Sequence, residues 1–90
     1  MQVRIPGLLR SYTKGAEVVI VEPREAAPTL GDALALLDAR YPGFRFRIVD
    51  EQRAIRPHIK IFVDRELVRD LGAAIGPEAE VMIVGALSGG

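Results

Sequence analysis

The sequence has no cysteine and no tryptophan, and only one histidine, among its 90 residues. Without cysteine the chain forms no disulfide bond, no thiolate metal site and no cysteine nucleophile. His58 follows Pro57 at the start of an expected strand, where a structural residue is typical, and no serine lies in a nucleophile-elbow context. A second histidine and a regularly spaced acidic loop are missing too, so no metal site is expected. The sequence therefore predicts a protein that is not an enzyme and binds no metal or cofactor.

Net charge is also absent, because 12 lysines and arginines balance 12 aspartates and glutamates. Proteins that capture nucleic acid or anionic lipid by electrostatics usually have a clear basic excess. The arginine-rich stretch 40–56 also contains Asp50 and Glu51, and we interpret it as a solvated loop and helix exit rather than a phosphate-binding patch. We therefore expect neither nucleic acid nor a membrane as a partner.

Long apolar runs are missing as well. The longest uncharged segment, residues 81–90, is about half the length that spans a bilayer. The first six residues show no basic start followed by an apolar stretch, so we expect no signal peptide and a soluble, cytoplasmic protein. A hydrophobic share of 49% is enough for a folded core, and a chain of this length has room for one domain.

The spacing of the apolar residues predicts one helix and several strands. The helix should run from Leu30 to Tyr41, because its apolar residues recur at helical spacing. Thr29 and Asp32 form a capping sequence at its start, and Pro42-Gly43 ends it. Alternating or β-branched runs predict the strands. These are 3–10 with an interruption at Pro6-Gly7, 18–21, 58–63, a short segment at 67–68, and 80–84.

Residues 44–57 have an irregular, polar pattern and are expected to form a long surface loop. A few apolar side chains should tuck under it, namely Phe44, Phe46, Ile48, Val49 and Ile55.

The first two strands should pair as a hairpin. The element order predicts an α+β fold in two layers, a mixed sheet of four to five strands with one main helix packed on one face.

The last six residues have neither charge nor pattern and end in Gly89-Gly90. We expect a folded domain over residues 1–84 and a flexible tail over residues 85–90. Glycine has no Cβ, so a glycine pair fits a channel too narrow for other residues, and six extended residues reach about 20 Å. A frayed terminus is nevertheless the commoner fate of end glycines. The glycine pair by itself leaves both interpretations open.

Several features together point to a known family. They are the initial hairpin, the capped helix ending in Tyr41-Pro42-Gly43, the strand Arg56–Val63, and the Glu80-Val81 strand followed by Gly89-Gly90. Over essentially its whole length the chain resembles the ubiquitin-like β-grasp sulfur carriers of the MoaD/ThiS family, which includes the small subunit of molybdopterin synthase. The segment Val3–Thr13 most resembles the branch that supplies sulfur for cysteine biosynthesis, the CysO type.

This resemblance implies a mechanism based on the terminal residue. A partner adenylyltransferase, similar to ubiquitin-activating enzymes, would use ATP to convert Gly90 to an acyl adenylate, and a sulfur source would then leave a thiocarboxylate there. An acceptor enzyme would receive the tail, with Gly89 as a thin spacer and Leu87 and Ser88 as contacts. Phe62, on the strand face opposite its neighbour Ile61, is a candidate for the docking surface, and a core position remains equally open for it.

The resemblance leaves the acceptor open. A cysteine synthase-like enzyme is slightly favoured, the large subunit of molybdopterin synthase follows closely, and sulfur for thiamine or tRNA is also compatible. Two other functions remain as alternatives. One is a ubiquitin-like modifier conjugated to other proteins through Gly90. The other is a plain β-grasp interaction module in which the glycines are incidental.

Overall fold

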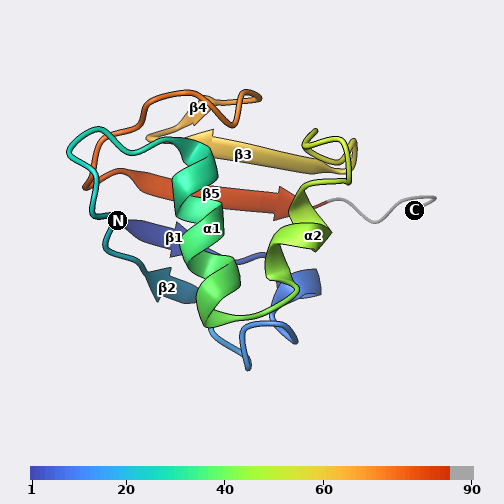
Figure 1. Cartoon of the computed structure of the whole chain (residues 1–90). Helices are drawn as coiled ribbons and strands as arrows, with labels where there is room; N and C mark the ends of the chain where they lie inside the picture. The colour runs from blue at the N-terminus through green and yellow to red at the C-terminus, as the bar shows by residue number, and fades with distance from the viewer. Residues whose placement is uncertain (86–90) are drawn as a thin grey trace.

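Five strands form one mixed sheet in this computed structural model, which describes residues 1–85. The strands are β1 (Gln2–Arg4), β2 (Val18–Ile20), β3 (Ile59–Val63), β4 (Glu66–Leu67) and β5 (Glu80–Gly85). They lie in the order β2-β1-β5-β3-β4 (Figure 1). β1 is parallel to β5, and the other neighbours are antiparallel. The predicted hairpin and mixed sheet are confirmed.

The predicted helix is confirmed as α1 (Leu30–Arg40), which crosses one face of the sheet (Figure 1). The hydroxyl of Thr29 accepts from the Asp32 backbone N–H at 3.1 Å, and the Asp32 carboxylate accepts from the Thr29 N–H at 2.8 Å. This reciprocal capping box satisfies two backbone donors that the first helical turn leaves without partners. The helix face that meets the sheet consists of Leu30, Ala33, Leu34 and Leu37, all buried.

The strand character predicted up to residue 10 is wrong beyond Arg4. Residues Gly7–Leu9 form instead the short 3₁₀-helix η1. Its bonds run from the Leu9 N–H to the Pro6 carbonyl at 2.9 Å and from the Arg10 N–H to the Gly7 carbonyl at 3.2 Å. Pro6 has no N–H to continue the ladder, which explains why the apolar pair that follows enters a tight turn rather than the sheet.

The predicted loop 44–57 is wrong in its first part, which forms the helix α2 (Phe44–Ile48). Phe44 and Ile48 are four residues apart, so they share the buried face of this turn, whereas Phe46 points away and is 52% exposed. The expectation that Phe46 tucks under the loop is therefore also wrong. After α2, the Asp50 carboxylate accepts from the N–H groups of Gln52 and Ala54, and Val49 and Ile55 form an isolated bridge.

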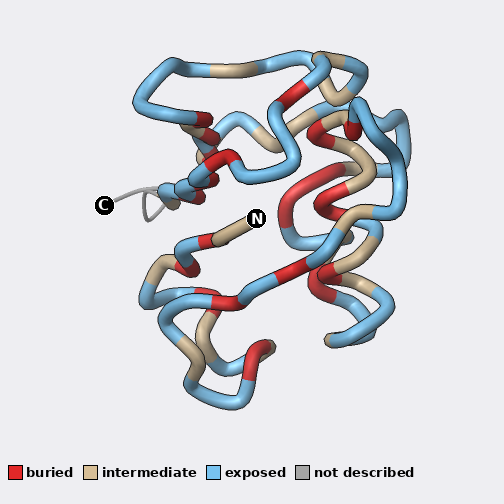
Figure 2. The backbone as a smooth tube through the Cα atoms, turned by 90° about the vertical axis from the view of Figure 1, so that its left-hand side faces the viewer, coloured by how far each residue is buried: buried red, intermediate tan, exposed pale blue. Residues whose placement is uncertain are grey.

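The core lies between the sheet and the helices, where the buried positions of Figure 2 gather. Along β3 the side chains alternate, with Ile59, Ile61 and Val63 buried and Lys60 exposed. β5 alternates in the same way and extends one residue further than predicted, to Gly85. One face of the sheet is therefore covered by α1, and the other faces solvent.

Candidate docking face and end of the central strand

Four of the predicted site residues, Leu87, Ser88, Gly89 and Gly90, lie outside the described residues. The structure does show where the described chain ends. Gly85 is the last residue of β5, in register with Ile59 at the start of β3. Because β5 lies between β1 and β3, Gly85 stands at the middle of one end of the sheet, the end at which α2 also lies (Figure 1).

Gly85 is not an open position. The side chain of Leu8, from η1, lies directly against it, and so does that of Ile59. Leu8 itself is 39% exposed. The sequence did not single out Leu8, since an apolar residue beside a buried Leu9 predicts only a further core position. Its location at the end of β5 depends on the 3₁₀ turn after Pro6.

Phe62 lies on the solvent face of the sheet, opposite the buried Ile61, and is half-buried there. This excludes the core position that the sequence left open for it. In the sheet register Phe62 is paired with Met82 of β5 on one side and with Leu67 of β4 on the other. Its side chain therefore belongs to a row that runs across the strands.

Further apolar side chains extend this row. Met82 and Val84 of β5 are each 39% exposed, and Val18 at the far edge faces Arg4 across the hairpin. We call the set the sheet patch, which consists of Val18, Phe62, Leu67, Met82 and Val84. Nothing among the described residues covers it as a second layer. Met82, Phe62 and Leu67 are direct neighbours in this row, and Arg4 lies between Met82 and Val18. An exposed apolar surface of this kind is typical of a protein interaction site.

The sequence contained a signal for this patch that pointed to a buried strand instead. Residues 81–84 are apolar without interruption, the pattern of a strand with both faces covered. Only one of those faces is covered by α1. The second set, Met82 and Val84, lies on the open face, where each side chain is partly exposed.

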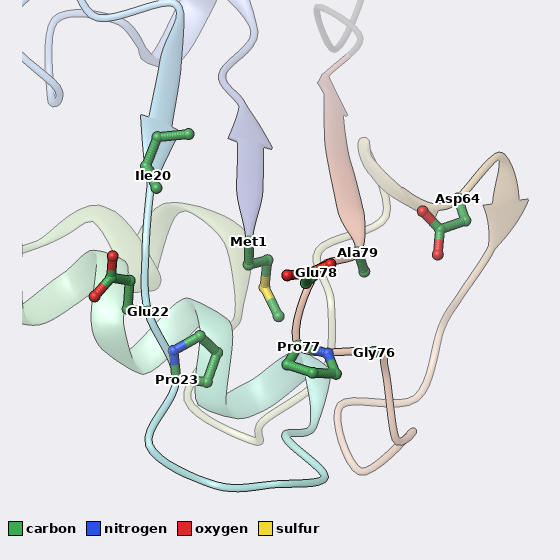
Figure 3. A pocket seen from close by; sticks show the side chains of 9 residues that line it. All are labelled: Met1, Ile20, Glu22, Pro23, Asp64, Gly76, Pro77, Glu78 and Ala79. Carbon is green, nitrogen blue, oxygen red and sulfur yellow. The ribbon is translucent and has the colours of Figure 1, made fainter.

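An open surface depression lies at the other end of the sheet. It has a volume of about 690 Å³ and is lined by Met1, Ile20, Glu22, Pro23, Asp64, Gly76, Pro77, Glu78 and Ala79. Figure 3 shows that the carboxylates of Glu22 and Asp64 stand on opposite sides of it and do not converge. Across residues 1–85 no group of three or more potential ligands could hold a metal ion.

The strand order with one helix across the sheet defines a β-grasp protein, the class to which ubiquitin-like proteins belong. The sequence matches the ThiS family over residues 3–90. The chain therefore belongs to the ThiS family, and the predicted fold and family are both confirmed.

Solved structures agree with this assignment. CysO from Amycolatopsis orientalis, in a complex with BexX, is 28% identical with a TM-score of 0.85, covering 99% of this chain and 98% of that one. CysO from Mycobacterium tuberculosis is 31% identical with a TM-score of 0.82, over 96% and 98%. SAMP1 from Haloferax volcanii is 26% identical with a TM-score of 0.83, over 100% and 98%.

A search of the curated proteins found no match to this sequence. In residues 1–85 there is no helix with the length and apolar character needed to cross a membrane.

Proposed function

We propose that this protein is a non-catalytic sulfur carrier that holds sulfur as a thiocarboxylate on Gly90. The observation that supports this most strongly is the ThiS-family match, which extends to residue 90 and so includes the glycine pair. A chain without cysteine has no thiol to hold sulfur, so the terminal carboxyl group is the remaining place for it.

The chemistry requires an activating partner. A terminal carboxylate is ionised at neutral pH and is a poor electrophile. Attack of the Gly90 carboxylate on the α-phosphorus of ATP would form an acyl adenylate and release pyrophosphate. A sulfur nucleophile would then attack the acyl carbon, AMP would leave with the electron pair of the broken C–O bond, and a thiocarboxylate would remain. In the acceptor enzyme the thiocarboxylate sulfur would bond to an electrophilic carbon of the acceptor substrate. Water would then hydrolyse the acyl–sulfur bond, which leaves the sulfur on the acceptor and returns the Gly90 carboxylate.

The sheet patch is the docking face in this proposal. The patch is apolar and exposed, and its member Val84 directly precedes Gly85 at the end of β5. A partner bound to the patch would therefore lie close to the point where the C-terminal segment begins. Phe62 and Met82 are at its centre, with Arg4 and Glu80 in an exposed ion pair of 3.9 Å beside them. Exposed pairs of this kind add little binding free energy, so the apolar side chains dominate the affinity.

The proposed acceptor pathway is cysteine biosynthesis, with molybdopterin synthesis as the next candidate. Two of the similar structures are CysO proteins, and the segment Val3–Thr13 resembles the same branch. In the Amycolatopsis structure CysO is in a complex with BexX, which supports a protein partner for this chain too.

A second candidate function is protein modification. The Haloferax SAMP1 structure resembles this chain over its full length, and that protein is described as a small archaeal modifier. Both functions begin with adenylation of Gly90. They differ in the product, which is a thiocarboxylate for the carrier and an isopeptide bond to a lysine for the modifier.

The adenylation step is tested by pyrophosphate release. The full chain, ATP and the ThiS-type activating enzyme from the same organism should release pyrophosphate only when all three are present. A variant lacking Gly89 and Gly90 is the control and should release none. Pyrophosphate release that is equal for the two chains contradicts the proposal. Higher-mass conjugates in cell extract that disappear with the same truncation would identify the modifier function.

A further inference from the structure

A groove lies beside β3 at the β4 edge of the sheet. Its volume is about 230 Å³, and the residues that line it include Arg56, Ile59, Lys60, Leu67, Val68 and Arg69. It exists because β4 pairs only with Phe62 and Val63, which leaves the first part of β3 without a strand partner on that side. The segments 54–57 and 67–69 form its two walls.

The walls are fixed by hydrogen bonds. On one side the Arg56 N–H donates to the Ile48 carbonyl at 2.9 Å, and the Arg56 carbonyl accepts from the Ile59 N–H at 2.9 Å. On the other side the Val68 N–H donates to the Ile61 carbonyl at 2.9 Å. A ligand would therefore meet a preformed groove and would not have to order it.

The charge of the groove is of one sign. Arg56, Lys60 and Arg69 line it, and no carboxylate does. None of the three takes part in the ion pairs found within residues 1–85. Arg56 is also held in place, since its Nε donates to the Phe46 carbonyl at 2.8 Å and its guanidinium lies 4.7 Å from the centre of the Phe46 ring. Its remaining N–H groups are available to a ligand.

The groove is continuous with the sheet patch. Leu67 belongs to both, and Lys60 is in register with Val84 on the open face of the sheet. Ile59, in the floor of the groove, is in register with Gly85. A partner that covers the sheet patch and receives the tail would therefore also reach this groove.

We propose that the groove binds an acidic, extended segment of the activating partner, with an aliphatic side chain over the floor and carboxylates toward Lys60 and Arg69. The groove itself is independent of the carrier function, and only the identity of its partner rests on that function. The groove's positive charge favours an anionic ligand, and its apolar lining favours a protein segment over nucleic acid. The lining is largely aliphatic, and the whole chain has no net charge to attract a polyphosphate.

The binding test uses a defined probe, the acetylated and amidated peptide Glu-Glu-Leu-Glu-Glu, titrated into the ¹⁵N-labelled full chain. The amide signals of residues 54–61 and 67–69 should shift. In the variant Lys60→Glu/Arg69→Glu the dissociation constant should rise about fivefold to tenfold, as expected for the loss of two exposed charge pairs. Neither side chain makes a hydrogen bond within the described part of the chain, so the variant should fold normally.

The matched control is Arg24→Glu/Arg65→Glu, which changes the net charge equally at exposed positions outside the groove. It should bind the peptide like the wild type. Shifts located elsewhere, no shifts at all, or equal weakening by the control overturn the proposal. So do equal shifts with Lys-Lys-Leu-Lys-Lys, or shifts of these amides with single-stranded oligouridylate in place of the acidic peptide.

A second measurement tests the partner. With the activating enzyme, Lys60→Glu/Arg69→Glu should raise the KM for the carrier about fivefold to tenfold while kcat stays unchanged. An unchanged KM overturns the assignment of the groove to this partner even when adenylation proceeds normally. Absence of adenylation with the wild-type chain would instead contradict the carrier function, and the peptide titration would still decide whether the groove binds acidic segments.

Discussion

Leu8 and Gly85 are in contact at the end of the central strand, and the contact depends on the missing side chain of the glycine. A Cβ at position 85 would lie 2.5 Å from Leu8 Cδ2 and 3.4 Å from Ile59 Cδ1. Gly85 has an ordinary strand conformation, so this close approach, rather than backbone conformation, is the structural reason for a glycine here.

Gly85→Ala should displace the Leu8 side chain toward solvent at a low cost in stability. The clashing atom is the end of a flexible, partly exposed side chain, so the free energy of unfolding should fall by less than about 1 kcal/mol. The Leu8 methyl signals in NMR spectra should move. Gly76→Ala is the control, because nothing lies within 4 Å of a Cβ there. Unmoved Leu8 methyl signals in Gly85→Ala would show that the contact is absent in solution.

Leu34→Ala should be strongly destabilising. Leu34 is 0% exposed at the centre of the face of α1 that meets the sheet. Truncation of a buried leucine leaves a cavity and typically costs about 2–5 kcal/mol, measured here by urea unfolding. Leu67→Ala makes the same chemical change at an exposed position and should cost less than about 1 kcal/mol. Equal losses for the two variants would contradict the two-layer arrangement.

Thr29→Ala should weaken the start of α1. The change removes the hydroxyl that accepts from the Asp32 N–H, so the free energy of unfolding should fall by about 1 kcal/mol. Thr29→Ser retains a hydroxyl and should restore most of the loss. If the serine variant is no more stable than the alanine variant, the capping bond does not contribute to stability.

Met82→Asp should weaken binding to the activating enzyme without unfolding the chain. Met82 is at the centre of the sheet patch with its side chain partly exposed. A carboxylate there would have to be desolvated on docking, so the KM for the carrier should rise at least about tenfold. Ala39→Asp, an exposed position on α1, is the control and should leave KM unchanged. A normal KM for Met82→Asp would exclude the sheet patch as the docking face.

The parts of the fold that local patterns determine were predictable. The helix over Leu30–Arg40 follows from apolar spacing and from the Thr29 and Asp32 cap, and the alternation in β3 follows from the residues themselves. The family resemblance then predicted the β-grasp fold, a mixed sheet with one main helix on one face. Local signals were enough for α1, which has both a cap and a period of 3.6, and for β3, which has a period of two.

The parts that depend on tertiary contacts were not predictable. α2 is a short helix of five residues. It forms because the side chains of Phe44 and Ile48 pack into the core, and the irregular pattern of residues 44–57 did not predict that packing. The sheet patch depends on register, since only the pairing of Phe62 with Met82 and Leu67 places these side chains in one row. The position of Leu8 depends on the 3₁₀-helix at Gly7–Leu9, where the sequence pattern predicted an interrupted strand.

The central claim is that Gly90 holds sulfur, and intact-mass measurement tests it most directly. After incubation with the activating enzyme, ATP and a sulfide source, the full chain should gain the mass difference between one sulfur and one oxygen. Fragmentation should place the change on Gly90, and the chain lacking Gly89 and Gly90 should show no change. The enzyme preparation is first shown to be active by thiolating a second, established carrier protein. An unaltered mass for the full chain with that active enzyme would contradict the account.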